Sequence, residues 1–121
     1  MLSPLVAPPP KRLESRLREL LVSLSILAVQ YWQQTTLKSK VDLANESGIW
    51  TVTLDRGSPK TQTLDRYMSL SSLPRKANTE AVLRTVHFVL AASEQKTTIR
   101  NRLTAKLEAY VDLIEEHGLH S

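Results

Sequence analysis

The sequence predicts an all-α fold, a compact bundle of about six helices. Apolar residues recur at spacings of three and four along three long segments, which is the period of one face of a helix. Residues that cap helices stand at the ends of those segments, and strand signals are weak. With 121 residues, of which 41% are hydrophobic, the chain is long enough for one domain around one modest core.

The first and longest helix is predicted over Lys11–Thr35. Its second half is apolar nearly all round, which indicates burial on several sides or a subunit contact. The segment before it, Met1–Pro10, carries three consecutive prolines and is expected to be an extended tail. The chain is therefore predicted to consist of this tail, residues 1–10, and a single helical domain, residues 11–118.

Two short helices are predicted next, over Lys40–Glu46 and Ile49–Arg56. Ser39 is a suitable N-cap for the first of them, because its hydroxyl can accept a free N–H group of the first turn. Gly48 permits the positive φ of a tight turn between the two helices, and Gly57 marks the end of the second.

A β-hairpin is the second interpretation of this region. The segment Ile49–Leu54 contains Trp50, Thr51, Val52 and Thr53, which favour strands by propensity. The hairpin would turn through Gly57–Lys60.

Three further helices are predicted over Leu64–Leu70, Thr79–Ser93 and Thr97–His117. Asn78 is the expected cap of the second, and the last two form a C-terminal helical pair within residues 78–117. The last helix has a nearly heptad-like apolar stripe, which is typical either of a coiled-coil dimer or of packing within the domain. A dimerisation or protein-interaction surface would use Trp32, Leu103, Leu107, Tyr110 and Ile114.

The segment Ser39–Gly57 resembles the helix-turn-helix of bacterial and phage regulators. A small residue stands on the first helix where the second helix crosses close to it, and a glycine follows four residues later at the turn. The positions that carry the resemblance are Leu43, Ala44, Gly48, Ile49 and Leu54. The resemblance implies that the second helix enters the major groove of DNA, with Leu54 on its inner face.

Carried over position by position, the resemblance implies two sets of DNA contacts. The residues facing the bases would be Trp50, Thr51, Val52, Asp55 and Arg56. The residues holding phosphates would be Lys38, Lys40, Lys60 and Arg66. The sequence departs from the pattern in that Trp50 and Val52 are poor base readers, and Asp55 repels phosphate. The alternative is a helix pair packed in the bundle, with Trp50 as a core or interface anchor.

Three phrases are also similar to the proteins that control heterocyst differentiation and pattern in filamentous cyanobacteria, the HetZ and PatU kind. They are Ala28–Thr36, Glu46–Trp50 and Thr63–Pro74, and the resemblance covers roughly Leu13–Leu90. It implies a transcription-linked regulator that acts with a protein partner.

The composition adds a mild preference for an anionic partner. The formal net charge is +4, which permits DNA binding without requiring it. A second phosphate-facing surface is conceivable in the last two helices and the connector before them, although a solvated face is the simpler interpretation. It would consist of Arg75, Lys76, Arg84, Lys96, Arg100, Arg102 and Lys106.

No enzyme is predicted. The chain has no cysteine, no Gly-x-Ser-x-Gly motif and only three glycines, so neither a thiol nucleophile, a nucleophile elbow nor a phosphate loop is available. No cofactor, metal site or membrane span is expected either. The sequence thus favours a cytoplasmic bacterial DNA-binding regulator, associated with the nucleoid, and the alternative is a protein-interaction or dimerisation module in which the helix-turn-helix is a scaffold.

Overall fold

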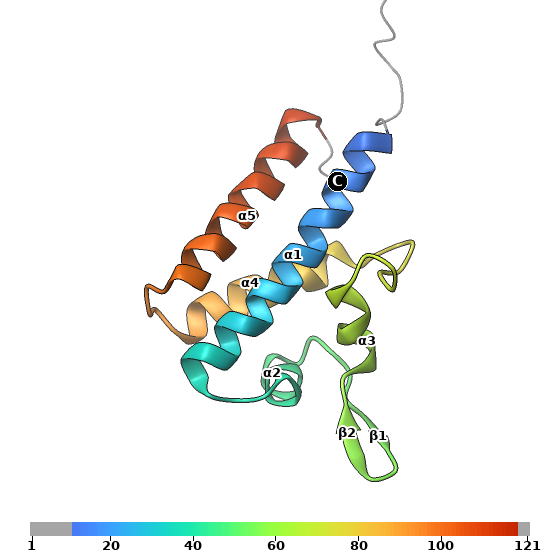
Figure 1. The fold of residues 1–121 in the computed structure, drawn as a ribbon, viewed down its shortest axis with the longest axis vertical. Coiled ribbons are helices and arrows are strands. Elements are labelled where there is room, and N and C mark those ends of the chain that lie inside the picture. Colours follow the sequence, from blue (N-terminus) through green and yellow to red (C-terminus); the bar gives the residue numbers. More distant parts are fainter. Residues whose placement is uncertain (1–10, 119–121) are drawn as a thin grey trace, which may run out of the picture.

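The computed structural model describes residues 11–118, so the predicted tail Met1–Pro10 lies outside the described residues. Within that range the chain forms five α-helices, one short 3-10 helix and one two-stranded sheet (Figure 1). In chain order these are α1 Lys11–Thr36, α2 Lys40–Ser47, β1 Thr53–Asp55, β2 Ser58–Lys60, α3 Gln62–Asp65, η1 Arg66–Met68, α4 Thr79–Ala92 and α5 Thr98–Glu116.

Helix α1 is the centre of the bundle. It packs against α5, α4, η1 and α2, which explains why its second half is apolar nearly all round. Figure 1 shows α5 running beside α1 and α4 passing behind it. Its fully buried side chains include Leu24, Ala28 and Tyr31. Removing such side chains from water is the dominant favourable contribution to folding.

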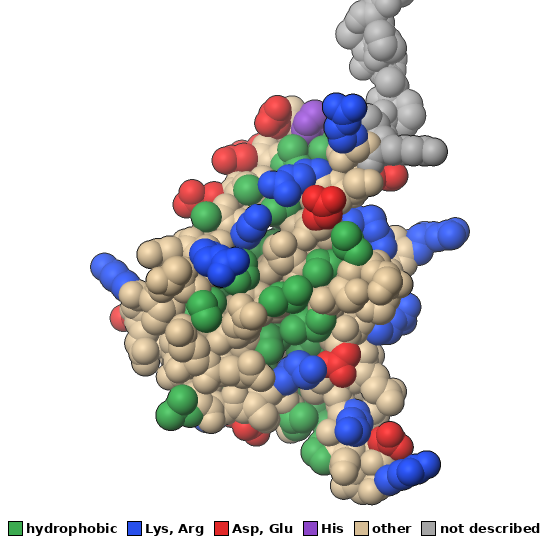
Figure 2. All heavy atoms as spheres, viewed as in Figure 1, with side chains coloured by type: hydrophobic (Ala, Val, Ile, Leu, Met, Phe, Trp, Pro, Cys, Tyr) green, Lys and Arg blue, Asp and Glu red, His purple; other side chains and the backbone are tan. Residues whose placement is uncertain are grey.

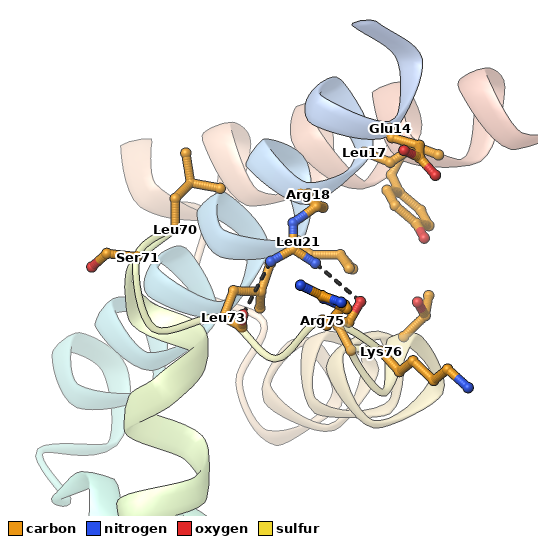
Figure 3. Close-up of a pocket in the computed structure, with 12 residues that line it drawn as sticks. Glu14, Leu17, Arg18, Leu21, Leu70, Ser71, Leu73, Arg75 and Lys76 are labelled. Carbon is orange, nitrogen blue, oxygen red and sulfur yellow. Dashed lines mark hydrogen bonds between the residues drawn. The ribbon is translucent and has the colours of Figure 1, made fainter. Parts of the chain in front are cut away.

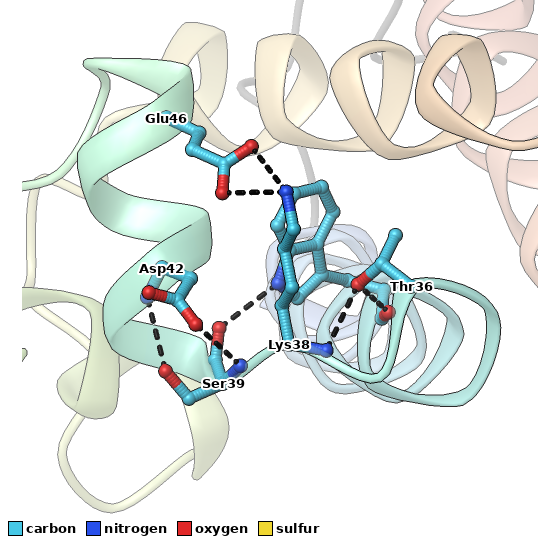
Figure 4. Close-up of polar contacts among 6 residues, drawn as sticks. Thr36, Lys38, Ser39, Asp42 and Glu46 are labelled. Atoms are coloured by element: carbon cyan, nitrogen blue, oxygen red, sulfur yellow. Dashed lines mark hydrogen bonds and ion pairs between the residues drawn. The ribbon is translucent and has the colours of Figure 1, made fainter.

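The junction between α1 and α2 has the caps that the sequence predicts (Figure 4). Ser39 accepts the N–H of Asp42 at 3.1 Å, and the Asp42 carboxylate accepts the N–H of Ser39 at 3.1 Å, which together make a capping box. At the other end Gly48 adopts φ 68°, and its N–H donates to the carbonyl of Ala44. No atom lies within 4 Å of a Cβ built at Gly48, so its backbone angle alone favours glycine there.

The predicted helix over Ile49–Arg56 is wrong. Residues 49–52 belong to no helix or strand, and β1 and β2 form an antiparallel hairpin in which Leu54 pairs with Pro59 and Asp55 with Ser58. The fold is therefore mostly helical rather than all-α, and the second interpretation, a hairpin through Gly57–Lys60, is the one that the structure has.

The hairpin has a local physical cause. Arg56 and Gly57 both have positive φ, 54° and 81°, so the two-residue turn has the I′ geometry that fits the twist of paired strands. Pro59 has no N–H to donate, and it stands one pair away from the turn, where antiparallel partners exchange no hydrogen bonds. A run of β-branched residues from Thr51 to Thr53 further disfavours a helix.

None of the helices in residues 11–118 combines the length and the apolar character that crossing a membrane requires.

Leu37 ends α1 in a left-handed conformation, which gives a stability prediction. Its φ is 59°, its N–H donates to the carbonyl of Gln33 at 3.1 Å, and its side chain is 89% exposed. We expect Leu37→Gly to raise the free energy of unfolding by about 0.5–1 kcal/mol, because relief of the left-handed strain exceeds the added entropy of the unfolded chain. Urea denaturation followed by circular dichroism measures the change.

The matched control is Leu37→Ala, which removes the same exposed side chain but keeps the strained Cβ. It should leave the unfolding free energy nearly unchanged. Equal effects of the alanine and glycine variants would contradict the assignment of strain to this residue.

Candidate nucleic-acid interface

Five exposed cations lie in the part of the chain between the hairpin turn and α4, along one side of the molecule. We call them the basic edge: Arg56 at the hairpin turn, Lys60 in β2, Arg66 in η1, and Arg75 and Lys76 in the loop before α4. Figure 2 shows Lys and Arg side chains over the hairpin and along the same side of the molecule above it. From Ile49 to Asn78 the only acidic residues are Asp55 and Asp65. This side therefore carries a local excess of positive charge.

Buried residues hold the hairpin at both ends. Trp50 precedes it and is only 7% exposed, and its Nε1–H donates to Thr85 Oγ1 in α4 at 2.7 Å. Thr61 follows it and is buried, and its hydroxyl donates to Asp65 Oδ1 at 2.9 Å. Leu64 of α3 is also buried. The hairpin is thus anchored at its base while every residue of both strands is exposed.

Arg18 of α1 holds the loop that carries the last two cations of the basic edge. Its guanidinium donates to the carbonyls of Leu73 and Pro74, each at 3.0 Å, and of Arg75 at 3.3 Å. Figure 3 shows this guanidinium reaching the loop, while the Lys76 side chain extends away from it. The loop, α1 and Tyr110 of α5 border an open cleft of about 670 Å³. The donors of the Arg18 guanidinium therefore hold the backbone of the loop in place. The side chains of Arg75 and Lys76 on this loop are exposed to solvent.

Negative charge is concentrated on a different element. The second half of α5 carries four exposed acidic residues, Glu108, Asp112, Glu115 and Glu116. Acidic side chains lie along the outer side of α5 in Figure 2, across the molecule from the hairpin. An anionic surface approaching the chain is attracted to the basic edge and repelled at this end of α5, so the charge distribution gives the domain an orientation.

The four predicted phosphate contacts fall into two pairs. Lys38 forms an ion pair with Glu46 at 2.9 Å and lies over the ring of Trp32 (Figure 4). Lys40 forms an ion pair with Asp65 that joins α2 to α3. Lys60 and Arg66 form no ion pair with any residue in 11–118, and both belong to the basic edge.

The predicted base-facing residues differ in how exposed they are in the structure. Thr51, Asp55 and Arg56 are exposed, and Val52 is half-buried. Trp50 is a correction: it lies in the core with its ring edge-on to Tyr67 at a centroid distance of 5.0 Å, so it cannot face DNA in this fold. The alternative interpretation of Trp50 as a core anchor is the one that the structure shows.

The helix-turn-helix positions also need a correction. Leu43 and Ala44 are buried and Gly48 makes the turn, as expected, and Ile49 packs partly against the core. Leu54, expected on the inner face of a second helix, is instead 75% exposed on β1. The reason is that no helix follows Gly48, and the strand projects away from the bundle.

Three of the predicted interface residues lie inside the domain. Trp32, Leu103 and Tyr110 are buried in the core of the single chain, and Leu107 and Ile114 pack partly against it. The stripe of α5 therefore contributes to packing against α1 within the domain. Dimerisation and a protein partner stay predictions.

Arg75, Lys76 and Arg100 are among the residues of the second basic surface, for which a solvated face is the simpler interpretation. Arg75 and Lys76 are exposed on the loop before α4, whereas Arg100 turns inward to Tyr31 and to backbone carbonyls. The serine-rich loop ending in Pro74-Arg75-Lys76 was the available signal, but its position depends on Arg18, a residue more than fifty positions away.

A comparison with solved structures finds a strong likeness. The crystal structure of the DNA-binding domain from the sensor histidine kinase ChiS from Vibrio cholerae matches with a TM-score of 0.84 and 26% sequence identity. The match covers 88% of this chain and 99% of that one. Neither the protein-family models nor the curated proteins give a match, and the resemblance to heterocyst regulators stays a prediction. The fold of this chain is thus similar, over nearly its whole length, to that of a DNA-binding domain.

Proposed function

We propose that this chain is a DNA-binding domain that contacts the phosphate backbone through the basic edge. The observation that carries the proposal is the likeness to the ChiS DNA-binding domain, which extends over nearly all of both chains. This likeness supports DNA as the class of ligand, but it does not identify the surface that contacts DNA. The surface is proposed from the charges of this chain.

The basic edge suits a phosphate backbone for two reasons. Its cations come from the hairpin, from η1 and from the loop before α4, so they span a length of surface rather than one point. Among them, Lys60 and Arg66 are exposed and form no ion pair within residues 11–118, so their charge is available to a ligand. Lysine and arginine side chains that neutralise phosphates release counterions, and this release favours binding.

The test is fluorescence anisotropy of a labelled mixed-sequence duplex, titrated with the protein at several salt concentrations. We expect affinity to fall steeply as salt rises, with a log–log slope of about −0.9 for each phosphate neutralised. Lys60→Ala and Arg66→Ala should each weaken binding to any sequence and reduce the slope by about one.

The matched control is Arg102→Ala, which removes an exposed arginine from α5, away from the basic edge. It should leave both affinity and slope unchanged. If Arg102→Ala weakens binding as much as Lys60→Ala, the contact either is diffuse attraction by net charge or includes the second basic surface, and the basic edge alone is not the interface. If the wild-type chain does not bind at low salt, DNA binding itself is wrong.

We further propose that binding serves transcription-linked regulation through a preferred DNA site. Arg56 belongs to the basic edge, and Thr51 and Asp55 are exposed on the same segment of the chain, where all three can meet base edges. Repeated selection of duplexes from a random pool should enrich one sequence, and Thr51→Ala should relax that preference more than it lowers affinity. A pool that stays random after selection would leave a DNA-binding domain without sequence preference.

A further inference from the structure

The hairpin displays an apolar pair that the fold does not use. Leu54 is 75% exposed, and its cross-strand partner Pro59 is exposed as well. Because side chains alternate along a strand, this pair lies on one face of the hairpin, and Thr53, Asp55, Ser58 and Lys60 lie on the other. Figure 1 shows the hairpin projecting from the helical bundle. An apolar surface on a projecting element has no partner within the described domain.

This pair is held in place before any ligand arrives. The I′ turn fixes the tip, and Leu54 and Pro59 form a pair without mutual hydrogen bonds, in which side chains lie closest together. Buried Trp50 and Thr61 anchor the base. Little conformational freedom remains to be lost on contact, so insertion into a partner has a low entropic cost.

The charges around the pair favour DNA over an apolar protein surface. Arg56 stands at the turn and Lys60 at the base of the hairpin, and both are exposed cations. Asp55, the one acidic residue of the hairpin, lies on the face opposite Leu54, and Lys60 lies on that face too, so Arg56 at the tip is the cation next to the apolar pair. An apolar wedge with a cation next to it matches the minor groove, where phosphates border a floor of base edges and sugars.

We infer that the hairpin enters the minor groove, and that Leu54 and Pro59 press against a base step and bend the duplex. The inference rests on the proposed DNA binding and adds to it the groove and the deformation. Apolar side chains inserted from the minor groove partly unstack a step and kink DNA away from it, and flexible pyrimidine–purine steps yield most easily.

The experiment uses a duplex of about thirty base pairs with a central TA step, labelled at its two ends with a donor and an acceptor dye. Binding of the wild-type chain should raise energy transfer between the ends, as expected for a kink of about 20–90°. Leu54→Ala should return energy transfer to the level of the free duplex while binding, read by anisotropy, persists. Netropsin, a minor-groove ligand, should displace the wild-type chain, and methyl green, a major-groove ligand, should not.

The matched control is Leu37→Ala, which truncates another exposed leucine, at the end of α1. It should bend DNA like the wild type, which separates the wedge from a general loss of apolar surface. Both leucines are exposed, so both variants should fold, and circular dichroism verifies this.

The possible failures are distinguishable. A wild-type chain that binds an unbent duplex, a Leu54→Ala variant that bends it fully, or displacement by methyl green alone would each overturn the wedge and leave DNA binding standing. The last outcome would assign the hairpin to the major groove. A wild-type chain that binds no duplex would overturn the proposed function and the wedge together.

Discussion

Trp50→Ala is expected to lower the free energy of unfolding by about 3–5 kcal/mol, the range for removing a buried tryptophan. Its ring lies edge-on to Tyr67, and its N–H donates to Thr85 in α4. Tyr67 in turn accepts the N–H of Asn78, the residue that caps α4. The substitution therefore removes the contact that ties the start of the hairpin to α4. Small domains have stabilities of about 5–15 kcal/mol, so this loss is a large part of the total.

The measurement is urea denaturation followed by circular dichroism, with Trp50→Phe as the milder variant if the alanine variant does not fold. Trp50→Phe keeps an aromatic ring but loses the hydrogen bond, at a cost of about 1–3 kcal/mol. Thr85→Val removes the acceptor and leaves the indole N–H buried without a partner. The sum of the losses in unfolding free energy in Trp50→Phe and Thr85→Val should exceed the loss in the double variant, because the two residues share one interaction.

The same variants decide between two interpretations of Trp50. A tryptophan that faced DNA would be exposed, and its replacement would lower DNA affinity while leaving stability within about 0.5 kcal/mol. The structure requires the opposite, a large loss of stability. A stable Trp50→Ala protein with weakened DNA binding would contradict the burial of this residue.

The four longer helices could be predicted from sequence because their signals are local. Each predicted boundary lies within one residue of the observed one. The reason is that amphipathic spacing and capping residues act within a few positions of the chain: Ser39 caps α2, and Asn78 caps α4 by accepting the N–H of Ala81. The positions of the buried faces followed from the same spacing.

The region after Gly48 could not be settled in this way. Its spacing fits a helical turn, and its β-branched residues fit a strand, so local signals conflict. The conflict is resolved by a contact between residues 35 positions apart, Trp50 and Thr85, which pulls the start of the segment into the core. Once Trp50 is buried there, the turn at Arg56–Gly57 favours a hairpin.

The residues of the candidate site could be predicted only in part, because local sequence patterns do not show tertiary contacts. The resemblance to a helix-turn-helix implies that Lys60 and Arg66 contact phosphates, and both are exposed on the basic edge. It implies the same of Lys40, but Lys40 pairs with Asp65, an interaction between α2 and α3 that no local pattern indicates. Whether a surface lysine is free or paired depends on tertiary contacts, so sequence alone finds the cations and not their availability.

Arg100→Ala is expected to lower the free energy of unfolding by about 1.5–3 kcal/mol, the range for hydrogen bonds to a charged group. Its Nη1 donates to the carbonyl of Ser93 and to the hydroxyl of Tyr31, each at 2.7 Å, and to the carbonyl of Leu90 at 3.3 Å. Helix α4 has no basic residue in its own last turn, so Arg100 of α5 supplies the cation at its C-terminal end. One side chain thus joins α1, α4 and α5, and its loss leaves carbonyls at the end of α4 without a charged donor.

Urea denaturation of Arg100→Ala, Arg100→Lys and Arg102→Ala measures this contribution. Lysine keeps the positive charge near the end of α4 but lacks the planar fork of donors, so Arg100→Lys should recover only part of the loss. Arg102 is exposed on the same helix, and Arg102→Ala should change stability by less than about 0.5 kcal/mol. If Arg100→Lys restores full stability, the contribution is electrostatic attraction to the helix end. If Arg100→Ala is as harmless as Arg102→Ala, the hydrogen bonds of Arg100 contribute little, and the Tyr31–Ser93 hydrogen bond is enough to join α1 to the end of α4.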